Sequence, residues 1–207
     1  MEMKYKTDQE NCWSTDFGND YPSRNEGEKM ISSNLALFSK IFKNCPEVHS
    51  VAELGCNIGL NLIALNRINK QLKLRGYEIN EKAAKSASEE GIAEIVNTTV
   101  VQELDASTTF DLTFTKGVLI HVNPDMLPAV YQNLYDLSNR YILVCEYYNP
   151  SPVSIDYRGN KDRLFKRDFA GELINKYGLK LVDYGFNYQH DPYLTQCDST
   201  WFLLSKN

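Results

Sequence analysis

Two glycines follow a short apolar stretch and precede a helical one. Residues 48–54 have the pattern of a buried strand, Gly55 and Gly59 come next, and apolar residues recur at helical spacing from Leu60 onward. In an open α/β sheet, such a turn lies at the carboxyl edge where ligands bind. Glycine lets the backbone approach a ligand closely, and the helix points its first amides at the same place. The sequence therefore predicts a nucleotide-type site at this turn.

The spacing of these glycines distinguishes two kinds of nucleotide site. A dinucleotide fingerprint, G-x-G-x-x-G, would place glycines at positions 57 and 60, where the chain has Asn57 and Leu60. The run from Glu53 to Gly59 is instead similar to the first motif of S-adenosylmethionine enzymes, with Asn57 in place of the usual middle glycine. S-adenosyl-L-methionine is therefore the predicted cofactor.

A second carboxylate, Glu78, ends the next predicted strand, about 20 residues beyond the turn, where it can accept hydrogen bonds from both ribose hydroxyls. The alternative is that Glu78 caps the helix that opens at Asn80. The third strand is expected to end within residues 98–102, near the adenine, and the sequence does not indicate which of these residues contacts the adenine. The predicted cofactor-binding residues are Tyr21, Arg24, Glu53, Gly55, Cys56, Asn57, Gly59, Glu78, Ile79, Thr99, Val100, Lys116, Gly117 and Val118.

Three residues at the ends of the fourth and fifth strands are candidates for catalysis. His121 follows the fourth strand and is expected to act as a general base if the acceptor must lose a proton. It could equally fix the turn into the helix that starts at Pro124. Glu146 and Tyr147 lie across the same crevice, and packing with loop hydrogen bonds is their alternative role.

The segment between the fifth strand and the last helix is rich in tyrosine and basic residues, although the chain as a whole is acidic. Arginine binds carboxylates and phosphates through forked hydrogen bonds, and tyrosine rings offer flat surfaces to a sugar. We therefore expect an anionic sugar or sugar-nucleotide acceptor; the alternative is a solvated charged loop with internal ion pairs. The predicted acceptor-binding residues are Tyr148, Asn149, Tyr157, Arg158, Arg163 and Lys166.

The elements that must position these residues alternate along the chain. An arm, residues 1–25, carries Trp13 and is expected to cover the cofactor, or else to pack on the sheet edge. Residues 26–207 are expected to form a single α/β domain, because alternating strands and helices imply a mostly parallel sheet with helices on both faces. Strands are predicted at 48–54, up to 79, and at 94–101, 110–115, 141–145, 179–188 and 199–204; helices at 28–43, 60–65, 80–91, 124–137 and 166–177. The last two strands are expected to form an antiparallel hairpin at one edge.

The composition and charge of the chain limit the kinds of partner that it is expected to bind. The 207 residues carry a net charge of −5 with both signs scattered, so no basic field favours nucleic acid or an anionic membrane. No stretch has the pattern of a signal peptide or a membrane span, and a cytoplasmic protein is expected. The five cysteines are expected to be reduced thiols, since none lies at metal-ligand or C-x-x-C spacing, and no metal site is expected. Oligomeric state is not predicted.

Several uncommon strings give the chain, from about Trp13 to its carboxyl end, a resemblance to methylases associated with pseudaminic acid biosynthesis. They are Phe17-Gly18-Asn19-Asp20-Tyr21 with Arg24-Asn25, Gly117-Val118-Leu119-Ile120-His121, Glu146-Tyr147-Tyr148-Asn149-Pro150, Tyr157-Arg158-Gly159 and residues 162–171. The resemblance implies a Rossmann-like class I methyltransferase linked to bacterial nonulosonic sugar pathways, with the acceptor unsettled. The alternatives are a binding scaffold that keeps the fold without catalysis, and a nucleotide-sugar or NAD-dependent enzyme.

Overall fold

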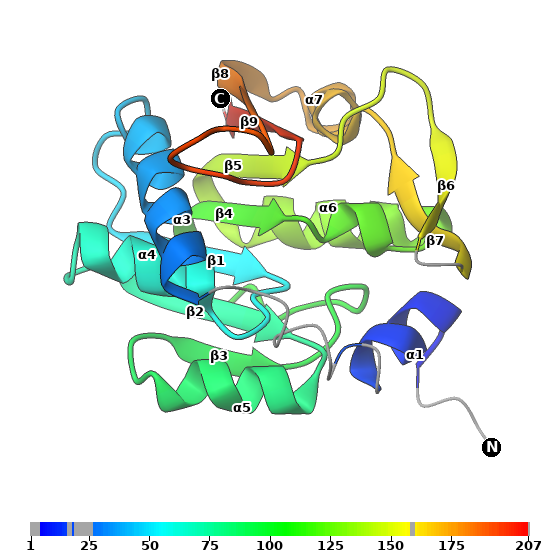
Figure 1. Ribbon diagram of the computed structural model, residues 1–207, viewed down its shortest axis with the longest axis horizontal. Coiled ribbons are helices and arrows are strands. Elements are labelled where there is room, and N and C mark those ends of the chain that lie inside the picture. Colours follow the sequence, from blue (N-terminus) through cyan, green and yellow to red (C-terminus); the bar gives the residue numbers. More distant parts are fainter. Residues whose placement is uncertain (1–4, 16–17, 19–26, 158–159, 207) are drawn as a thin grey trace.

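A seven-stranded sheet runs through the molecule. The computed structural model describes residues 5–15, 18, 27–157 and 160–206 (Figure 1). The sheet has the strand order β3-β2-β1-β4-β5-β9-β8. Its strands are β1 (Ser50–Leu54), β2 (Lys73–Glu78), β3 (Glu94–Asn97), β4 (Phe110–Lys116), β5 (Ser138–Glu146), β8 (Lys180–Asn187) and β9 (Ser199–Ser205). β1 to β5 are parallel, and β9 pairs antiparallel with both β5 and β8. The predicted fold, a mostly parallel sheet with an antiparallel carboxyl-terminal hairpin, is confirmed.

The strand order reverses direction at β1. From β1 the chain adds β2 and then β3 on one side, and it returns to place β4 and β5 on the other. The loops that leave β1 and β4 therefore diverge, and they open a crevice between the carboxyl ends of these two strands.

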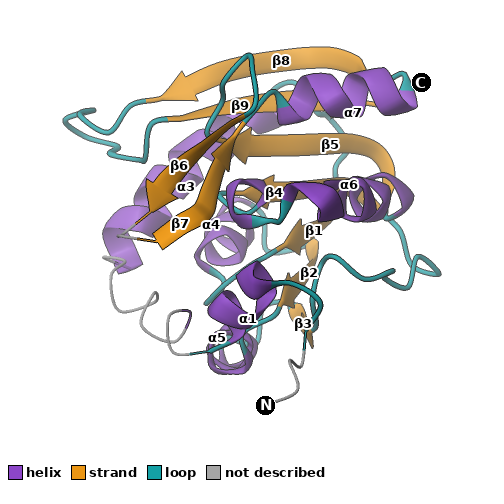
Figure 2. Cartoon of the chain, turned by 90° about the vertical axis from the view of Figure 1, so that its right-hand side faces the viewer, coloured by secondary structure: helices purple, strands orange, loops and turns teal. Residues whose placement is uncertain are grey.

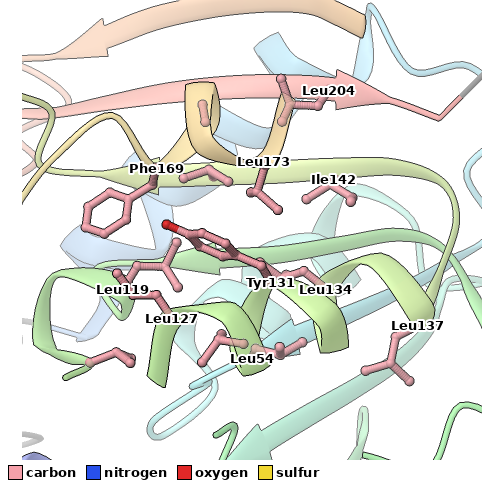
Figure 3. Packing of buried hydrophobic residues seen from close by; sticks show 14 of the residues in the cluster. Leu54, Leu119, Leu127, Tyr131, Leu134, Leu137, Ile142, Phe169, Leu173 and Leu204 are labelled. Atoms are coloured by element: carbon pink, nitrogen blue, oxygen red, sulfur yellow. The ribbon is translucent and has the colours of Figure 1, made fainter. Parts of the chain in front are cut away.

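Helices cover both faces of the sheet (Figure 1). α3 (Gly27–Phe42) and α4 (Leu60–Ile68) pack on one face, where Phe38 and Leu65 share a buried cluster with Val51 of β1. α6 (Leu127–Asp136) and α7 (Phe169–Tyr177) pack on the other, and Figure 3 shows Leu134 and Leu173 in the same cluster as Leu54. α5 (Glu81–Glu89) lies against β2 and β3. Because side chains alternate along a strand, β1 contributes to both clusters and is buried on both sides.

The structure corrects the prediction between the fifth strand and the last helix. β6 (Val153–Tyr157) and β7 (Asn160–Lys166) form an antiparallel hairpin of their own where a loop was expected. Lys166 was predicted to begin the last helix, yet it pairs with Val153 in this hairpin. The helix begins at Phe169 instead, because the Asp168 carboxylate accepts a hydrogen bond from the Gly171 amide and caps it.

Two smaller boundaries also differ. The third strand ends at Asn97 and does not reach residue 101. The helix predicted from Pro124 begins as the 3₁₀ turn η3 (Pro124–Met126), and Asn123 caps this turn through its side chain. A second 3₁₀ turn, η2 (Leu119–His121), follows β4.

Two elements outside the main layers lie beside the carboxyl edge of the sheet. α1 (Asp8–Ser14) begins at the capping residue Thr7, whose hydroxyl accepts from the Glu10 amide. Figures 1 and 2 both place α1 and the β6–β7 hairpin at the edge where β1, β4 and β5 end. The crevice therefore has a cover made of sequence-distant segments.

Candidate active site

A cavity of about 530 Å³ opens at this edge. Its walls come from the turns after β1, β2 and β4, from the end of β5, and from α1, α3 and the β6–β7 hairpin. Volumes of 300–1,000 Å³ are usual for small-molecule sites, and the carboxyl edge at the strand-order reversal is where such sites form in this architecture.

The turn after β1 is held by backbone geometry. Gly55 has a φ of +84°, which favours glycine, and its amide donates to the Tyr77 carbonyl at 2.8 Å. A Cβ at Gly55 would lie 2.5 Å from Cγ2 of Val118, so the turn after β1 packs directly on the turn after β4. Cys56, the next residue, is buried and also donates its amide to Tyr77. These predicted residues all line the cavity.

Asn57 occupies the position where the motif usually has its middle glycine, and its backbone conformation explains why an asparagine is accommodated there. Its φ is +50°, in the left-handed region that asparagine tolerates better than most residues. The side-chain Oδ1 accepts from the Ile58 amide at 2.7 Å, so the side chain stabilises its own turn. Gly59 follows with a φ of +82° and starts α4 with its backbone close to Ala87 of α5.

Glu78 lies against the same turn. Its Oε2 accepts from the Asn57 amide and its Oε1 from the Asn80 amide, both at 2.7 Å. Each carboxylate oxygen has a second lone pair, so the group keeps acceptor capacity toward the cavity that it lines. Burial raises the pKa of Glu78, and the amide hydrogen bonds oppose this shift. Helix α5 is capped by the side chain of Asn80, which accepts from Ala83.

The predicted adenine side is joined to α1. Ile79, Thr99 and Val100 line the cavity, and the Thr99 hydroxyl donates to Oε1 of Glu10 at 2.7 Å. Glu10 is buried although it is charged, because its Oε2 also accepts from the amide and the hydroxyl of Thr7. This link fixes α1 over the loop after β3.

The turn after β4 carries the other predicted residues of the floor. Lys116, Gly117 and Val118 line the cavity, and Gly117 has a φ of +70°. Glu146 is fully buried behind this turn, and its carboxylate accepts from the amides of Val118 at 3.0 Å and Leu119 at 3.2 Å. Burial raises the pKa of Glu146 to about 7. The predicted catalytic residue Glu146 thus holds the turn in place by hydrogen bonds to its backbone.

His121 stands between aromatic rings from two covering elements. Its ring centroid lies 4.7 Å from that of Trp13 in α1 and 5.1 Å from that of Tyr157 in β6. Its Nδ1 is 2.8 Å from the main-chain oxygen of Arg163. A carbonyl only accepts, so Nδ1 carries the hydrogen and Nε2 of the neutral ring is the acceptor nitrogen. Burial lowers the pKa of His121 to about 4, and the ring is therefore neutral at pH 7.

Of the predicted acceptor residues, Tyr157 lines the cavity, as does the predicted catalytic residue Tyr147. The ammonium of Lys166, another predicted acceptor residue, lies 5.2 Å from the centroid of the Tyr147 ring. Tyr148 is 43% exposed and packs against Phe202 on the sheet.

The other predicted site residues either are not among those that line the cavity or lie outside the described residues. Asn149 donates to Ser151, and Arg163 approaches His121 through its carbonyl, while its buried Nη1 has no hydrogen-bond partner among the described residues. Tyr21, Arg24 and Arg158 lie outside the described residues.

The cavity also contains polar residues that the sequence patterns did not indicate. Thr7-x-x-Glu10 is a capping-box pattern, which indicates a helix start at Thr7, whereas the place of Glu10 beside the cavity follows from its contact with Thr99. No comparable signal marks Asn34 of α3, Asn61 of α4 or Gln196 before β9, which all line the same cavity.

The fold resembles that of several solved methyltransferases, at low sequence identity. Magnesium protoporphyrin IX methyltransferase (ChlM) from Synechocystis PCC 6803 with bound SAH has a TM-score of 0.68 and 15% identity, over 97% of this chain and 100% of that one. The plantazolicin methyltransferase BpumL in complex with SAH has a TM-score of 0.67 and 13% identity, over 96% and 94%. The glycopeptide N-methyltransferase MtfA complexed with S-adenosyl-L-homocysteine has a TM-score of 0.66 and 9% identity, over 84% and 89%.

These likenesses place the chain in the fold of the class I methyltransferases. In sequence, it matches no protein-family model and no curated protein. Within the described ranges, no helix has the length and apolar character needed to cross a bilayer. The five cysteines are free thiols.

Proposed function

We propose that the chain transfers a methyl group from S-adenosylmethionine to a small acceptor. This proposal is carried by one observation: the predicted cofactor turn and the candidate base His121 lie in the same cavity. The turn after β1 packs against Glu78, and His121 lies in the same cavity with a fixed tautomer. The fit of the cofactor to this turn rests on the spare acceptor capacity of the Glu78 carboxylate, which lines the cavity beside Gly55 and Asn57.

The residues of this chain would act by binding and alignment. When bound, S-adenosylmethionine supplies a methyl group that is already electrophilic. Glu78 would accept hydrogen bonds from ribose hydroxyls, while Ile79 and Val100 would flank the adenine. His121 would accept a hydrogen bond from the acceptor at Nε2 and take its proton, because Nδ1 is already committed to Arg163. Glu146 keeps the Val118 turn in position.

We propose an anionic sugar or sugar nucleotide as the acceptor, in keeping with the resemblance to pseudaminic acid-associated methylases. The rings of Trp13 and Tyr157 beside His121 give a sugar ring two apolar surfaces. Arg163 contacts His121 through its main-chain oxygen, and its guanidinium is the cation that we propose for the negative charge of the acceptor. Arg167 does not serve this purpose, because it pairs with Glu172 at 2.6 Å.

The segment 1–25 is proposed to act as a cover over the cofactor. α1 supports this role, since Gln9, Glu10 and Trp13 line the cavity. Deleting residues 1–25 should abolish cofactor binding while unfolding stays cooperative. Undiminished affinity in the truncated protein would reject the cover.

A methyl-transfer assay with sugars bearing amino, hydroxyl or carboxyl groups tests the proposed function. S-adenosylhomocysteine should form only with an accepted sugar, and the product should gain one methyl group by mass spectrometry. Arg158→Ala and Arg163→Ala should raise the acceptor KM without changing cofactor affinity. Cofactor binding without transfer to any acceptor would leave a binding scaffold, and absence of cofactor binding would reject the function altogether.

A further inference from the structure

Strand β8 forms one edge of the sheet and exposes large aromatic side chains. Among the described strands it pairs only with β9, and Figures 1 and 2 both show it at the edge of the sheet opposite β3. Tyr184 is 64% exposed, Phe186 is 59% exposed and Tyr188 is 53% exposed. Single exposed apolar residues are common on protein surfaces, whereas a contiguous group of them marks a binding surface or an aggregation site.

The exposed rings form one surface on the face of the sheet that carries α7. Tyr184 lies opposite Phe202 of β9, and their ring centroids are 6.3 Å apart with planes 18° apart. Phe202 packs against the buried cluster that α7 joins, and its ring is also 5.9 Å from that of Tyr148. Farther along β8, the rings of Phe186 and Tyr188 are 6.3 Å apart. The exposed rings of β8 therefore continue toward the loop after β5.

Leu181 extends this surface toward the start of β8. It is 49% exposed, and its cross-strand partner Leu204 belongs to the cluster on the α7 face. The exposed apolar surface, which we call the aromatic strip, consists of Tyr148, Leu181, Tyr184, Phe186 and Tyr188. None of these five residues is among those that line the cavity. The aromatic strip is therefore separate from the proposed catalytic site.

The size of the aromatic strip matches one half of a dimer interface. Burying a whole tyrosine or phenylalanine removes about 150–250 Å² from water, so the exposed parts of the strip offer on the order of 500–600 Å². Two copies packed strip against strip would bury about 1,000–1,200 Å² in total, which is at the lower end of the range for specific interfaces. A two-fold axis places the same rings against each other, and two-fold dimers are the commonest oligomers.

Charge and backbone geometry favour a second copy over two other occupants. The strip contains no lysine or arginine, which surfaces that bind anionic lipids use, and the chain has a net charge of −5. The amide of Tyr184 donates to Oδ1 of Asp183 at 2.8 Å, so a peptide that added a strand at the edge would compete with this bond. Packing of ring against ring leaves the bond intact.

We propose that the aromatic strip binds the same strip of a second copy of this chain and forms a two-fold dimer. The contact is made by side chains on the α7 face of β8, and not by hydrogen bonds that extend the sheet. This inference does not depend on the proposed function, because the strip shares no residue with the lining of the cavity.

Sedimentation velocity of the full-length protein tests the dimer. Between about 1 and 100 µM the wild type should pass from monomer to dimer, because an interface of this size is expected to give micromolar affinity. Tyr184→Lys and Phe186→Lys should each weaken the dimer by about 10-fold or more, since each removes a ring and places like charges across the two-fold axis. Tyr193→Lys is the matched control, because Tyr193 is 86% exposed in the loop after β8 and lies outside the strip.

Circular dichroism and urea unfolding at the lowest concentration check that each variant folds. Both substitutions are at exposed positions, so the monomers should keep the secondary structure of the wild type. If a variant does not fold, the concentration series on the wild type still decides, because a wild type that stays monomeric throughout overturns the proposal.

Three further outcomes would also overturn it. A wild-type dimer that both strip variants leave unchanged uses another surface. Equal weakening by Tyr193→Lys would show a general effect of added charge and not a contact at the strip. A monomeric wild type that sediments with phosphatidylcholine vesicles, while Tyr184→Lys does not, would assign the strip to a lipid surface.

Discussion

The cavity has two sides that are built differently. On the turn side, formed by the loops after β1, β2 and β4, the groups that line the cavity are held by backbone hydrogen bonds and positive φ angles at Gly55 and Gly117. On the His121 side, aromatic rings come from α1, η2 and β6, which are far apart in the sequence. The turn side depends on local conformation and the His121 side on how separate elements pack. Changes on the first should affect cofactor binding, and changes on the second should affect turnover and acceptor choice.

The largest effect is expected on the His121 side. His121→Ala should lower kcat by about 10²- to 10⁴-fold if the acceptor loses a proton during transfer. S-adenosylhomocysteine affinity should remain within a few-fold of wild type, since the groups proposed to hold the cofactor lie on the turn side. Rapid-mixing kinetics and calorimetry on the same preparation measure both quantities. Unchanged kcat would indicate an acceptor that needs no base, such as a carboxylate.

The pH profile sharpens this prediction. The pKa of His121 is lowered to about 4 by burial, so the neutral, active form is present above pH 4 and is lost as pH falls through 4. With cofactor saturating, titration of His121 alone should leave kcat/KM for the acceptor level from pH 8 to about pH 5. Protonation of Glu146, whose pKa is raised to about 7, should add a fall near pH 7 that Glu146→Gln removes, because the carboxylate then no longer holds the Val118 turn. A fall near pH 6.5 that persists in Glu146→Gln would mean that an ordinary, solvated imidazole controls the rate.

The next effect concerns the turn side. Gly55→Ala places an alanine at φ +84° and a Cβ 2.5 Å from Val118. The left-handed conformation costs about 1–2 kcal/mol and overpacking about 1–3 kcal/mol, so the free energy of unfolding should fall by roughly 2–5 kcal/mol. Urea unfolding measures this loss. Adding Val118→Ala should recover the packing part of it, and no recovery would show that the two turns do not press on each other.

Glu78 provides a smaller effect on the same side. Glu78→Ala should weaken S-adenosylhomocysteine binding by about 10- to 100-fold, because charge-assisted hydrogen bonds contribute about 1.5–3 kcal/mol. Glu94→Ala, which removes an exposed carboxylate from β3, is the control and should bind normally. Equal affinity in Glu78→Ala and wild type would remove Glu78 from the site and leave it as a support for the Asn57 turn.

The two sides also differ in how far the sequence predicted them. Gly55 and Glu78 were predicted and lie around one turn that lines the cavity, because each follows or ends a strand, β1 and β2 respectively. Gly59 was also predicted, but it starts α4 and is not among the residues that line the cavity. Asn57 was predicted as a site residue, but its left-handed conformation follows from the fold of the turn. Local signals therefore defined the turn side well.

The covering elements were predicted less well. Val153, Ile155 and Tyr157 alternate with polar residues, which is the pattern of a strand, and the prediction of a loop at β6–β7 was wrong. The main-chain oxygen of Arg163 bonds to His121, a contact that no side-chain pattern encodes and that is separate from the role predicted for its guanidinium. Gln196 meets α3 across 163 residues of sequence, and only the strand order brings them together.

The smallest effect is expected for the aromatic rings beside His121, and it distinguishes the contribution of α1 from that of the β6–β7 hairpin. Trp13 and Tyr157 flank His121 at 4.7 and 5.1 Å, one from α1 and one from β6. Aromatic contacts of this kind contribute about 0.5–1.5 kcal/mol, so Trp13→Ala and Tyr157→Ala should each raise the acceptor KM by about 2- to 10-fold. Tyr157→Phe keeps the ring and should behave like wild type. If both rings contact one acceptor ring, the double variant should lose less than the two single losses combined, because either ring alone then holds the acceptor only loosely. Strict additivity would mean that the rings act separately and that α1 and β6 read different parts of the acceptor.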